Sequence, residues 1–199
     1  MKLLPAIEEL INFLSPKSIL DYGCGKGLLV RTLAQKYPTI KVYGYDPGVQ
    51  EFENLPEDKI DFVINTDVLE HIPQEELPET IQLISCLSRN VFFHLNHTKA
   101  IAILPNGENA HCTIWSLEKY YELFKGFFPY VTLLPGLSAI NSSAVTFELP
   151  QEIKDRISRV LQSQHDQIVL NKALNQLYAK SRQMVLSQFD KFFIESLRY

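Results

Sequence analysis

A glycine-rich turn between a short apolar run and a helical pattern is the feature that most constrains how this chain folds. Gly23, Gly25 and Gly27 follow the run 18–22 and precede the helical pattern 28–37. Glycine lets a turn tighten and lets a ligand approach the backbone. The helix that begins behind the turn presents unpaired N–H groups, which favour a negative charge or a carboxylate. We therefore expect a strand–turn–helix unit with a ligand at the turn.

Strand and helix patterns alternate along the first 150 residues. Strands are predicted over 18–22, 41–45, 60–65 and 91–95, and helices over 4–14, 28–37, 75–88 and 116–125. Two last strands, a candidate antiparallel pair, are predicted over 130–134 and 144–149. The region 96–115 reads as a polar loop. This alternation predicts an α/β fold with a mostly parallel sheet and helices on both faces.

The spacing of the turn discriminates between ligand classes. A phosphate-binding P-loop needs Ser or Thr after its lysine, whereas Lys26 is followed by Gly27. A dinucleotide turn reads G-x-G-x-x-G, whereas this one reads G-x-G-x-G. Asp21, two residues before Gly23, would repel a pyrophosphate but suits the ammonium of an amino acid. The combination favours S-adenosylmethionine, which carries no phosphate.

A second acidic residue, Asp46, ends the strand predicted over 41–45. A carboxylate there, about twenty residues past the turn, can accept hydrogen bonds from both hydroxyls of a ribose. Dinucleotide and methyl-donor sites share this feature, so it does not separate them. The alternative is that Asp46, Pro47 and Gly48 form only a turn.

Three stretches in order, 21–27, 43–46 and 65–73, resemble the motifs of class I S-adenosylmethionine-dependent methyltransferases. The resemblance implies a Rossmann-like doubly wound sheet, S-adenosyl-L-methionine as methyl donor and S-adenosyl-L-homocysteine as product. Because only 47–59 separates Asp46 from the next strand, the family's third strand is missing or very short here. The cofactor-binding residues that the resemblance implies are Asp21, Gly23, Cys24, Gly25, Asp46, Pro47, Thr66, Asp67 and Val68. Glu70 and His71 belong to the third stretch too, in either a structural or a functional role.

The methyl acceptor is expected beyond the carboxyl ends of the strands, next to the polar loop. Transfer to oxygen needs a base, and histidine is the usual one. His97 and His111 are the candidate catalytic residues, whereas His94 is read as part of the strand core. His97, His111 and Cys112 also have metal-ligand chemistry. We nevertheless expect no metal, since His94 and His97 would point to opposite faces of a strand.

These features predict a methyltransferase that acts on a small molecule, with O-methylation of a sugar, a phosphorylated metabolite or a secondary metabolite as the leading hypothesis. The net charge of −4 offers no general attraction to nucleic acid, so no nucleic-acid partner is expected. One alternative is N-methylation of a macromolecule. Another is a non-catalytic module of the same fold that only binds the cofactor.

The last part of the chain differs in composition, since 151–199 contains no glycine or proline. We predict a domain over 1–150 and an extension of amphipathic helix over 151–199, in two segments. Its apolar stripe, which includes Phe189, Phe192 and Phe193, is large for a surface in water. We expect it to pack on the domain, cover the acceptor pocket, or form a homodimer, and we favour packing with a homodimer.

The remaining sequence features concern the compartment. The three cysteines form no close pair, which is typical of a reducing environment. The first residues lack the pattern of a signal peptide, and no apolar run is long enough for a membrane span. The expected location is cytoplasmic, with no membrane partner.

Overall fold

The computed structural model describes residues 2–196, with side chains except at 181 and 184–196. The chain divides into two units between Leu161 and Gln162, so the first unit runs past the boundary that we predicted at Pro150. None of the described helices combines the length and the apolarity that crossing a membrane requires.

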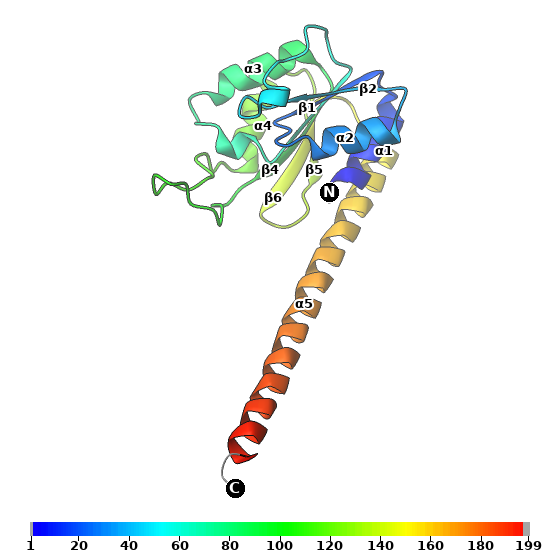
Figure 1. Ribbon diagram of the computed structural model, residues 1–199. Coiled ribbons are helices and arrows are strands. Elements are labelled where there is room, and N and C mark those ends of the chain that lie inside the picture. The colour runs from blue at the N-terminus through cyan, green and yellow to red at the C-terminus, as the bar shows by residue number, and fades with distance from the viewer. Residues whose placement is uncertain (1, 197–199) are drawn as a thin grey trace. The chain divides into compact units, whose positions relative to one another are not determined.

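The first unit is a six-stranded sheet with helices on both faces, which confirms the predicted fold class (Figure 1). Its elements are α1 (Leu4–Leu14), β1 (Ser18–Tyr22), α2 (Leu28–Lys36), β2 (Lys41–Tyr45), the 3₁₀ turn η1 (Gln50–Phe52), β3 (Phe62–Thr66), the 3₁₀ turn η2 (Leu69–His71), α3 (Leu77–Leu87), β4 (Val91–Asn96), α4 (Leu117–Lys125), β5 (Thr132–Pro135), β6 (Asn141–Val145) and the start of α5 (Gln151–Ser196).

The strand order is β2-β1-β3-β4-β6-β5. β2, β1, β3 and β4 run parallel, while β6 is antiparallel to both β4 and β5. Because parallel strands point the same way, the ends of β1, β2, β3 and β4 lie at one edge of the sheet. Ligands of open α/β sheets bind at that edge.

Alternate side chains of each strand face opposite layers, as the pleat requires. On one face, Val63 and Phe93 pack with α3 and α4, where Ile81 and Phe124 are fully buried. Phe93 stacks on Phe124 with ring centroids 4.3 Å apart. The other layer holds α1 and α2, whose apolar stripes recur at helical spacing.

We predicted that the family's third strand is missing or very short, and residues 46–61 contain η1 and no strand. The last strand was predicted too late, at 144–149 instead of Asn141–Val145. Asn141, Ser142 and Ser143 look like loop residues, yet they pair with β4, while the Asn141 side chain is hydrogen-bonded to Ser138. His94 and His97 both contact these serines, which explains how a polar stretch forms a buried strand.

The tail forms one helix, α5, and not the two segments we predicted. Its first turns belong to the first unit, in which Ile157 and Leu161 are fully buried and Arg156 pairs with Glu9 of α1. In the second unit, large apolar side chains are exposed along the helix, namely Val169, Leu170, Leu174, Leu177 and Tyr178. The side chains of Phe189, Phe192 and Phe193, which we predicted in the stripe, lie outside the described residues.

Candidate active site

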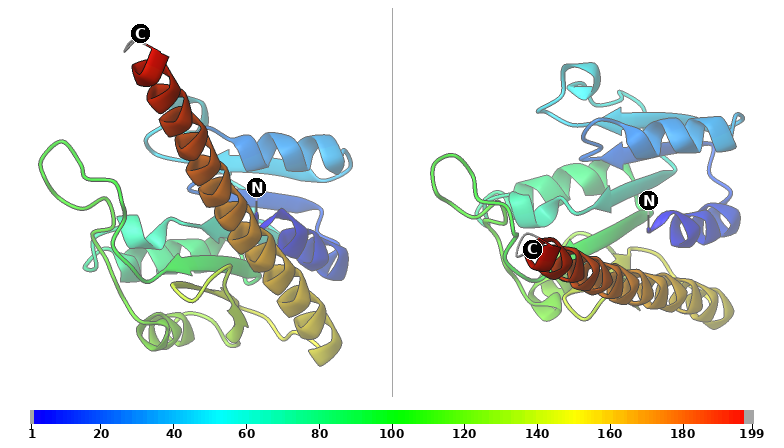
Figure 2. Two further views of the ribbon diagram at one scale, coloured as in Figure 1. Left: turned by 90° about the horizontal axis from the view of Figure 1, so that it is seen from below. Right: turned by 60° about the horizontal axis from the view of Figure 1, so that its bottom comes forward.

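The predicted site residues follow the carboxyl ends of the parallel strands. β1 leads into Gly23, β2 into Asp46, β3 into Asp67 and β4 into His97. These segments come together because the four strands are parallel neighbours. The loop between β4 and α4, which carries His111, extends from the same edge (Figure 2).

The glycine turn is held in a conformation that favours glycine. The φ angles of Gly23, Gly25 and Gly27 are 84°, 53° and 71°, in the left-handed region. The Tyr45 carbonyl accepts hydrogen bonds from the amides of Gly23 (2.7 Å) and Cys24 (3.0 Å), which fixes the turn to the end of β2. A Cβ at Gly23 would lie 2.3 Å from the nearest Val68 methyl carbon. The missing side chain is therefore needed for the β3–η2 segment to approach the turn.

Asp46 joins the same turn from β2. Its Oδ2 accepts a hydrogen bond from the Gly25 amide at 2.8 Å, and its Oδ1 accepts one from the Gly48 amide at 3.0 Å. The predicted turn alternative is thus also realised, because the carboxylate closes the turn at Gly48. Carboxylate oxygens have further lone pairs, so both contacts leave acceptor capacity.

Asp21, near the end of β1, is only 4% exposed. Burial, together with the nearby charge of Asp46, raises the pKa of its carboxyl to about 7. Both causes disfavour the ionised form. A cationic group placed beside Asp21 and Asp46 would relieve both the burial cost and the repulsion between the two carboxylates.

A pocket of about 550 Å³ opens at this edge of the sheet. It is lined by Tyr22, Gly23, Tyr45, Asp46, Pro47, Asp67, Val68, His71, Ile72, Glu76 and Thr80. Its volume lies within the range of about 300–1,000 Å³ that is usual for small-molecule sites. Five of the predicted cofactor-binding residues line it, whereas Asp21, Cys24, Gly25 and Thr66 are not among its lining residues.

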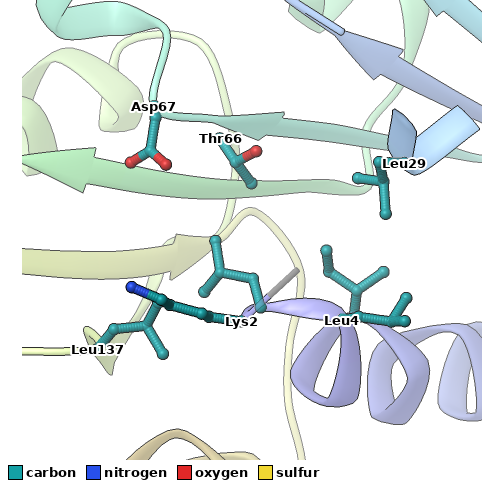
Figure 3. Close-up of a pocket in the computed structure, with 8 residues that line it drawn as sticks. Lys2, Leu4, Leu29, Thr66, Asp67 and Leu137 are labelled. Atoms are coloured by element: carbon teal, nitrogen blue, oxygen red, sulfur yellow. The ribbon is translucent and has the colours of Figure 1, made fainter. Parts of the chain in front are cut away.

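A second pocket, of about 360 Å³, lies between α1 and the end of β3 (Figure 3). Its walls are mostly aliphatic, with Leu4 and Leu29 among them, and Thr66 and Asp67 add polar groups. Asp67 lines both pockets. Its φ of 56° is unusual for a residue with a side chain, and its amide donates to the His94 carbonyl at 3.1 Å. Asp67 therefore stands where the two pockets adjoin.

A family model described as a methyltransferase domain matches residues 2–127 of this chain. The chain belongs to this methyltransferase family. No curated protein matches it.

Solved structures share the fold of this methyltransferase at low sequence identity. One is described as a putative O-methyltransferase from Nostoc punctiforme, with 16% identity, a TM-score of 0.55, and coverage of 74% of this chain and 57% of that one. The methyltransferase domain of bacterial CtHen1 has 15% identity, a TM-score of 0.55, and coverage of 74% of this chain and 98% of that one. Human N-acetylserotonin methyltransferase, solved in complex with SAM, has 14% identity, a TM-score of 0.51, and coverage of 75% of this chain and 51% of that one. This chain thus spans little more than half the length of the first and third of these proteins.

The structure gives the candidate histidines of the methyltransferase different surroundings. Both ring nitrogens of His97 are engaged, Nδ1 with the Trp115 carbonyl and Nε2 with the Ser142 hydroxyl, each at 2.7 Å. His94 is a buried strand residue, as predicted, with Nδ1 2.9 Å from the Ser143 hydroxyl. Desolvation lowers the pKa of His94, although the charge of Asp67 opposes this. Neither ring has the free, accessible nitrogen that a base needs.

His111 has one ring nitrogen to offer. Its Nδ1 lies 2.5 Å from the Thr98 carbonyl, so Nδ1 carries the proton and Nε2 keeps its lone pair. His71 has the same arrangement, with Nδ1 2.7 Å from the Ala110 carbonyl. The two rings meet edge to face, with centroids 4.8 Å apart.

Sequence reasoning did not place Glu70 and His71 beside His111. Glu70 is fully buried, and neither carboxylate oxygen has a hydrogen-bond partner among the described residues. Burial, with a smaller contribution from the charge of Asp67, raises the pKa of its carboxyl to about 7. The adjacent Glu70 and His71 were the signal in the sequence, but their neighbour on the loop, His111, is about forty residues away.

Proposed function

We propose that this methyltransferase uses S-adenosyl-L-methionine to methylate a hydroxyl group of a small molecule with an apolar body. The observation that carries the proposal is the 550 Å³ pocket, in which Gly23, Asp46 and Asp67 meet at the ends of three neighbouring strands. S-adenosylmethionine supplies an electrophilic methyl group when it is bound.

The residues around this pocket suit that cofactor. Asp21 and Asp46 place two carboxyls near the glycine turn, where the methionine ammonium would neutralise the repulsion between them. The Gly23 backbone lines the pocket without a side chain, so an amino-acid carboxylate can approach it. Asp46, with Pro47 beside it, is placed to accept hydrogen bonds from ribose hydroxyls. Asp67 and Val68, which directly follow β3, complete the wall, and Thr66 ends the strand next to them.

The acceptor is assigned to the pocket in Figure 3 because it adjoins the first pocket at Asp67. Aliphatic walls favour an apolar or aromatic body, since burial of apolar area drives its binding. Thr66 and Asp67 supply the polar end that would orient a hydroxyl. This chemistry favours a secondary metabolite over a phosphorylated acceptor. A phosphate would need cationic side chains to bind it, and Lys2 is the one cation among the residues that line the pocket.

The proton of the acceptor hydroxyl needs a destination. Of the two predicted bases, His111 has a free Nε2, whereas both nitrogens of His97 are hydrogen-bonded. His111 lines neither pocket, but its ring contacts that of His71, which lines the 550 Å³ pocket. In this proposal we assign the acid–base role to His111 on the ground of its available nitrogen.

Two measurements test the proposal in order. Calorimetry with S-adenosylmethionine, S-adenosylhomocysteine and NAD should show binding of the first two only. A screen of hydroxylated aromatic and aliphatic acceptors should then yield a methylated product. Mass spectrometry should show that this product is heavier than the acceptor by one CH₂ unit, because a methyl group replaces the hydroxyl hydrogen. NAD binding alone would overturn the cofactor assignment. Cofactor binding with methylation only of added protein or RNA would overturn the acceptor class.

A further inference from the structure

Glu70 presents an electrostatic problem that the methyl-transfer site does not explain. Its side chain is fully buried in η2, and both carboxylate oxygens lack a hydrogen-bond partner in the described part of the chain. Burying an unpaired carboxylate is costly, and proteins normally resolve this by pairing it or by binding a cation. Within the described part of the chain, no lysine or arginine forms an ion pair with Glu70 that would offset the cost of burying its charge.

Two imidazoles stand beside this carboxylate. Glu70, His71 and His111 each offer one ligand atom, and these atoms lie within 4.8 Å of one another. Glu70 and His71 come from η2, whereas His111 comes from the loop between β4 and α4. Residues from two distant segments thus converge on one point.

The hydrogen bonds of both histidines favour the tautomer that leaves Nε2 available as a metal ligand. His71 and His111 each direct Nδ1 at a backbone carbonyl, of Ala110 and Thr98 respectively. A ring that donates from Nδ1 to a carbonyl leaves Nε2 unprotonated and fixed in orientation, which is the usual outer support of a metal-binding histidine.

The backbone holds the two segments in register. The Thr113 amide donates to the Glu70 carbonyl at 3.0 Å, and the Thr113 hydroxyl donates to the Ile72 carbonyl at 2.6 Å. With the bond from His71 to Ala110, these contacts fix the loop to η2 on both sides of His111. The cluster is therefore a built arrangement and does not depend on surface side chains that meet by chance.

We propose that Glu70, His71 and His111 form a binding site for a divalent transition-metal ion of the zinc class. Two imidazoles and one carboxylate are a ligand set that zinc accepts, and they leave at least one coordination position open. The set is too nitrogen-rich for magnesium, which prefers oxygen ligands. This inference differs from our expectation of no metal, which considered His97, His111 and Cys112 as ligands and did not consider Glu70 and His71.

The site goes beyond the proposed function and does not rest on it. His71 also lines the 550 Å³ pocket, so an ion held here is reachable from the cofactor side. A bound ion would occupy the Nε2 atom that we assigned to proton removal. His111 is therefore a ligand in the loaded protein and a base only in the metal-free one.

The test uses the full chain, stripped with a chelator and free of cofactor, and titrated with Zn²⁺ by calorimetry. We expect one ion per chain, with much weaker binding of Mg²⁺. Glu70→Gln, His71→Ala and His111→Ala should each weaken Zn²⁺ binding by more than the ~10–100-fold that loss of an outer support costs. His165→Ala and Cys86→Ser, which change a histidine and a thiol elsewhere, should leave the affinity unchanged. Absence of one-to-one binding, or equal affinity in Glu70→Gln, would overturn the site.

A second measurement avoids the variants, in case one of them fails to fold. Anomalous diffraction at the zinc edge from crystals of the wild-type chain should place a peak between Glu70, His71 and His111. A peak elsewhere, or none at saturating Zn²⁺, overturns the proposal. Both readouts are made without S-adenosylmethionine, so failure of the cofactor assignment leaves them interpretable.

Discussion

The carboxylate of Asp46 accepts a hydrogen bond from the Gly25 amide at 2.8 Å, which ties the end of β2 to the glycine turn after β1. This side chain shapes the turn, and in our proposal it would also accept hydrogen bonds from the ribose. Removal of the Asp46 carboxylate should therefore affect both the conformation of the glycine turn and the binding of the ribose.

We predict that Asp46→Ala lowers the affinity for S-adenosylmethionine at least tenfold. Hydrogen bonds to a charged group contribute roughly 1.5–3 kcal/mol each, and ribose would lose such an acceptor. Calorimetry measures the loss. Asp58→Ala is the matched control, since Asp58 is an exposed carboxylate on the same β2–β3 segment. Equal affinity of the Asp46 variant and the control would contradict the ribose assignment.

Gly23→Ala should destabilise the fold more than Gly107→Ala. Both glycines have φ near +85°, at 84° and 87°, so both substitutions carry backbone strain on the order of 1–3 kcal/mol. Only at Gly23 does the new Cβ collide, with Val68, because nothing lies within 4 Å at Gly107. Urea unfolding gives the difference, and adding Val68→Ala should recover part of it. Equal losses at the two glycines would show that the close approach to Val68 is unimportant.

The pKa of Asp21 predicts how stability depends on pH. The folded-state pKa of about 7 exceeds the ordinary value of 3.8, so the folded protein holds this proton over a range in which the unfolded chain releases it. The free energy of unfolding therefore falls as pH rises from about 4 to about 7, by something on the order of 4 kcal/mol from this group. Asp21→Asn should remove that component.

Urea unfolding of wild type and Asp21→Asn at several pH values isolates the component. This comparison is needed because Glu70, with its own pKa raised to about 7, acts in the same direction in both proteins. The asparagine variant should gain stability over wild type as pH rises toward 7. A difference that does not change with pH would show that Asp21 ionises normally.

The histidines should separate in their effects. His97→Ala leaves the Ser142 hydroxyl and the Trp115 carbonyl without their partner, so it should lower the free energy of unfolding by about 1–3 kcal/mol. His111→Ala should instead lower turnover by about 10²–10⁴-fold with cofactor affinity kept. Unfolding and product assays on both variants check this, and full turnover in His111→Ala would refute any chemical role.

The exposed apolar residues of the second unit predict self-association, which is the homodimer we expected from the sequence. Light scattering of the full chain should give twice the 22.9 kDa of one chain. Leu174→Glu should dissociate the dimer, whereas Asn175→Glu, one position along the helix, should not.

Truncation tests the same surface. A chain ending at Leu161 should be a stable monomer, while one ending at Pro150 loses the buried Ile157 and Leu161 and should be less stable. A monomeric full chain would rule out the dimer.

The parallel sheet and the glycine turn were predictable because they depend on local patterns. Each parallel strand is a short apolar run, and each turn residue has its own backbone requirement. Strand β6 was placed wrongly because Ser142 and Ser143 are polar, and their partners His94 and His97 are about 45–49 positions away.

In the candidate site, too, residues of contiguous motifs were predictable and contacts between distant segments were not. Gly23 and Asp46 lie in contiguous motifs, and the structure brings both to one pocket. The meeting of His71 with His111 depends on how a long loop returns to η2, held by hydrogen bonds from the His71 ring to the Ala110 carbonyl and from the Thr113 hydroxyl to the Ile72 carbonyl, which join residues 39 and 41 positions apart. No spacing rule in the sequence encodes that path.

The lack of a strand between β2 and β3 in the chain bears on how this protein avoids aggregation through the edges of its sheet. With no strand beyond it, β2 is one margin of the sheet, and β5 is the other. Unpaired backbone groups on such margins invite strands from other molecules, and this is the route to aggregation. Both margins are short, at five and four residues, the first begins with Lys41, and the second ends with Pro135. A lysine and a proline at the margins oppose pairing with a foreign strand, so neither margin favours association between copies through the sheet.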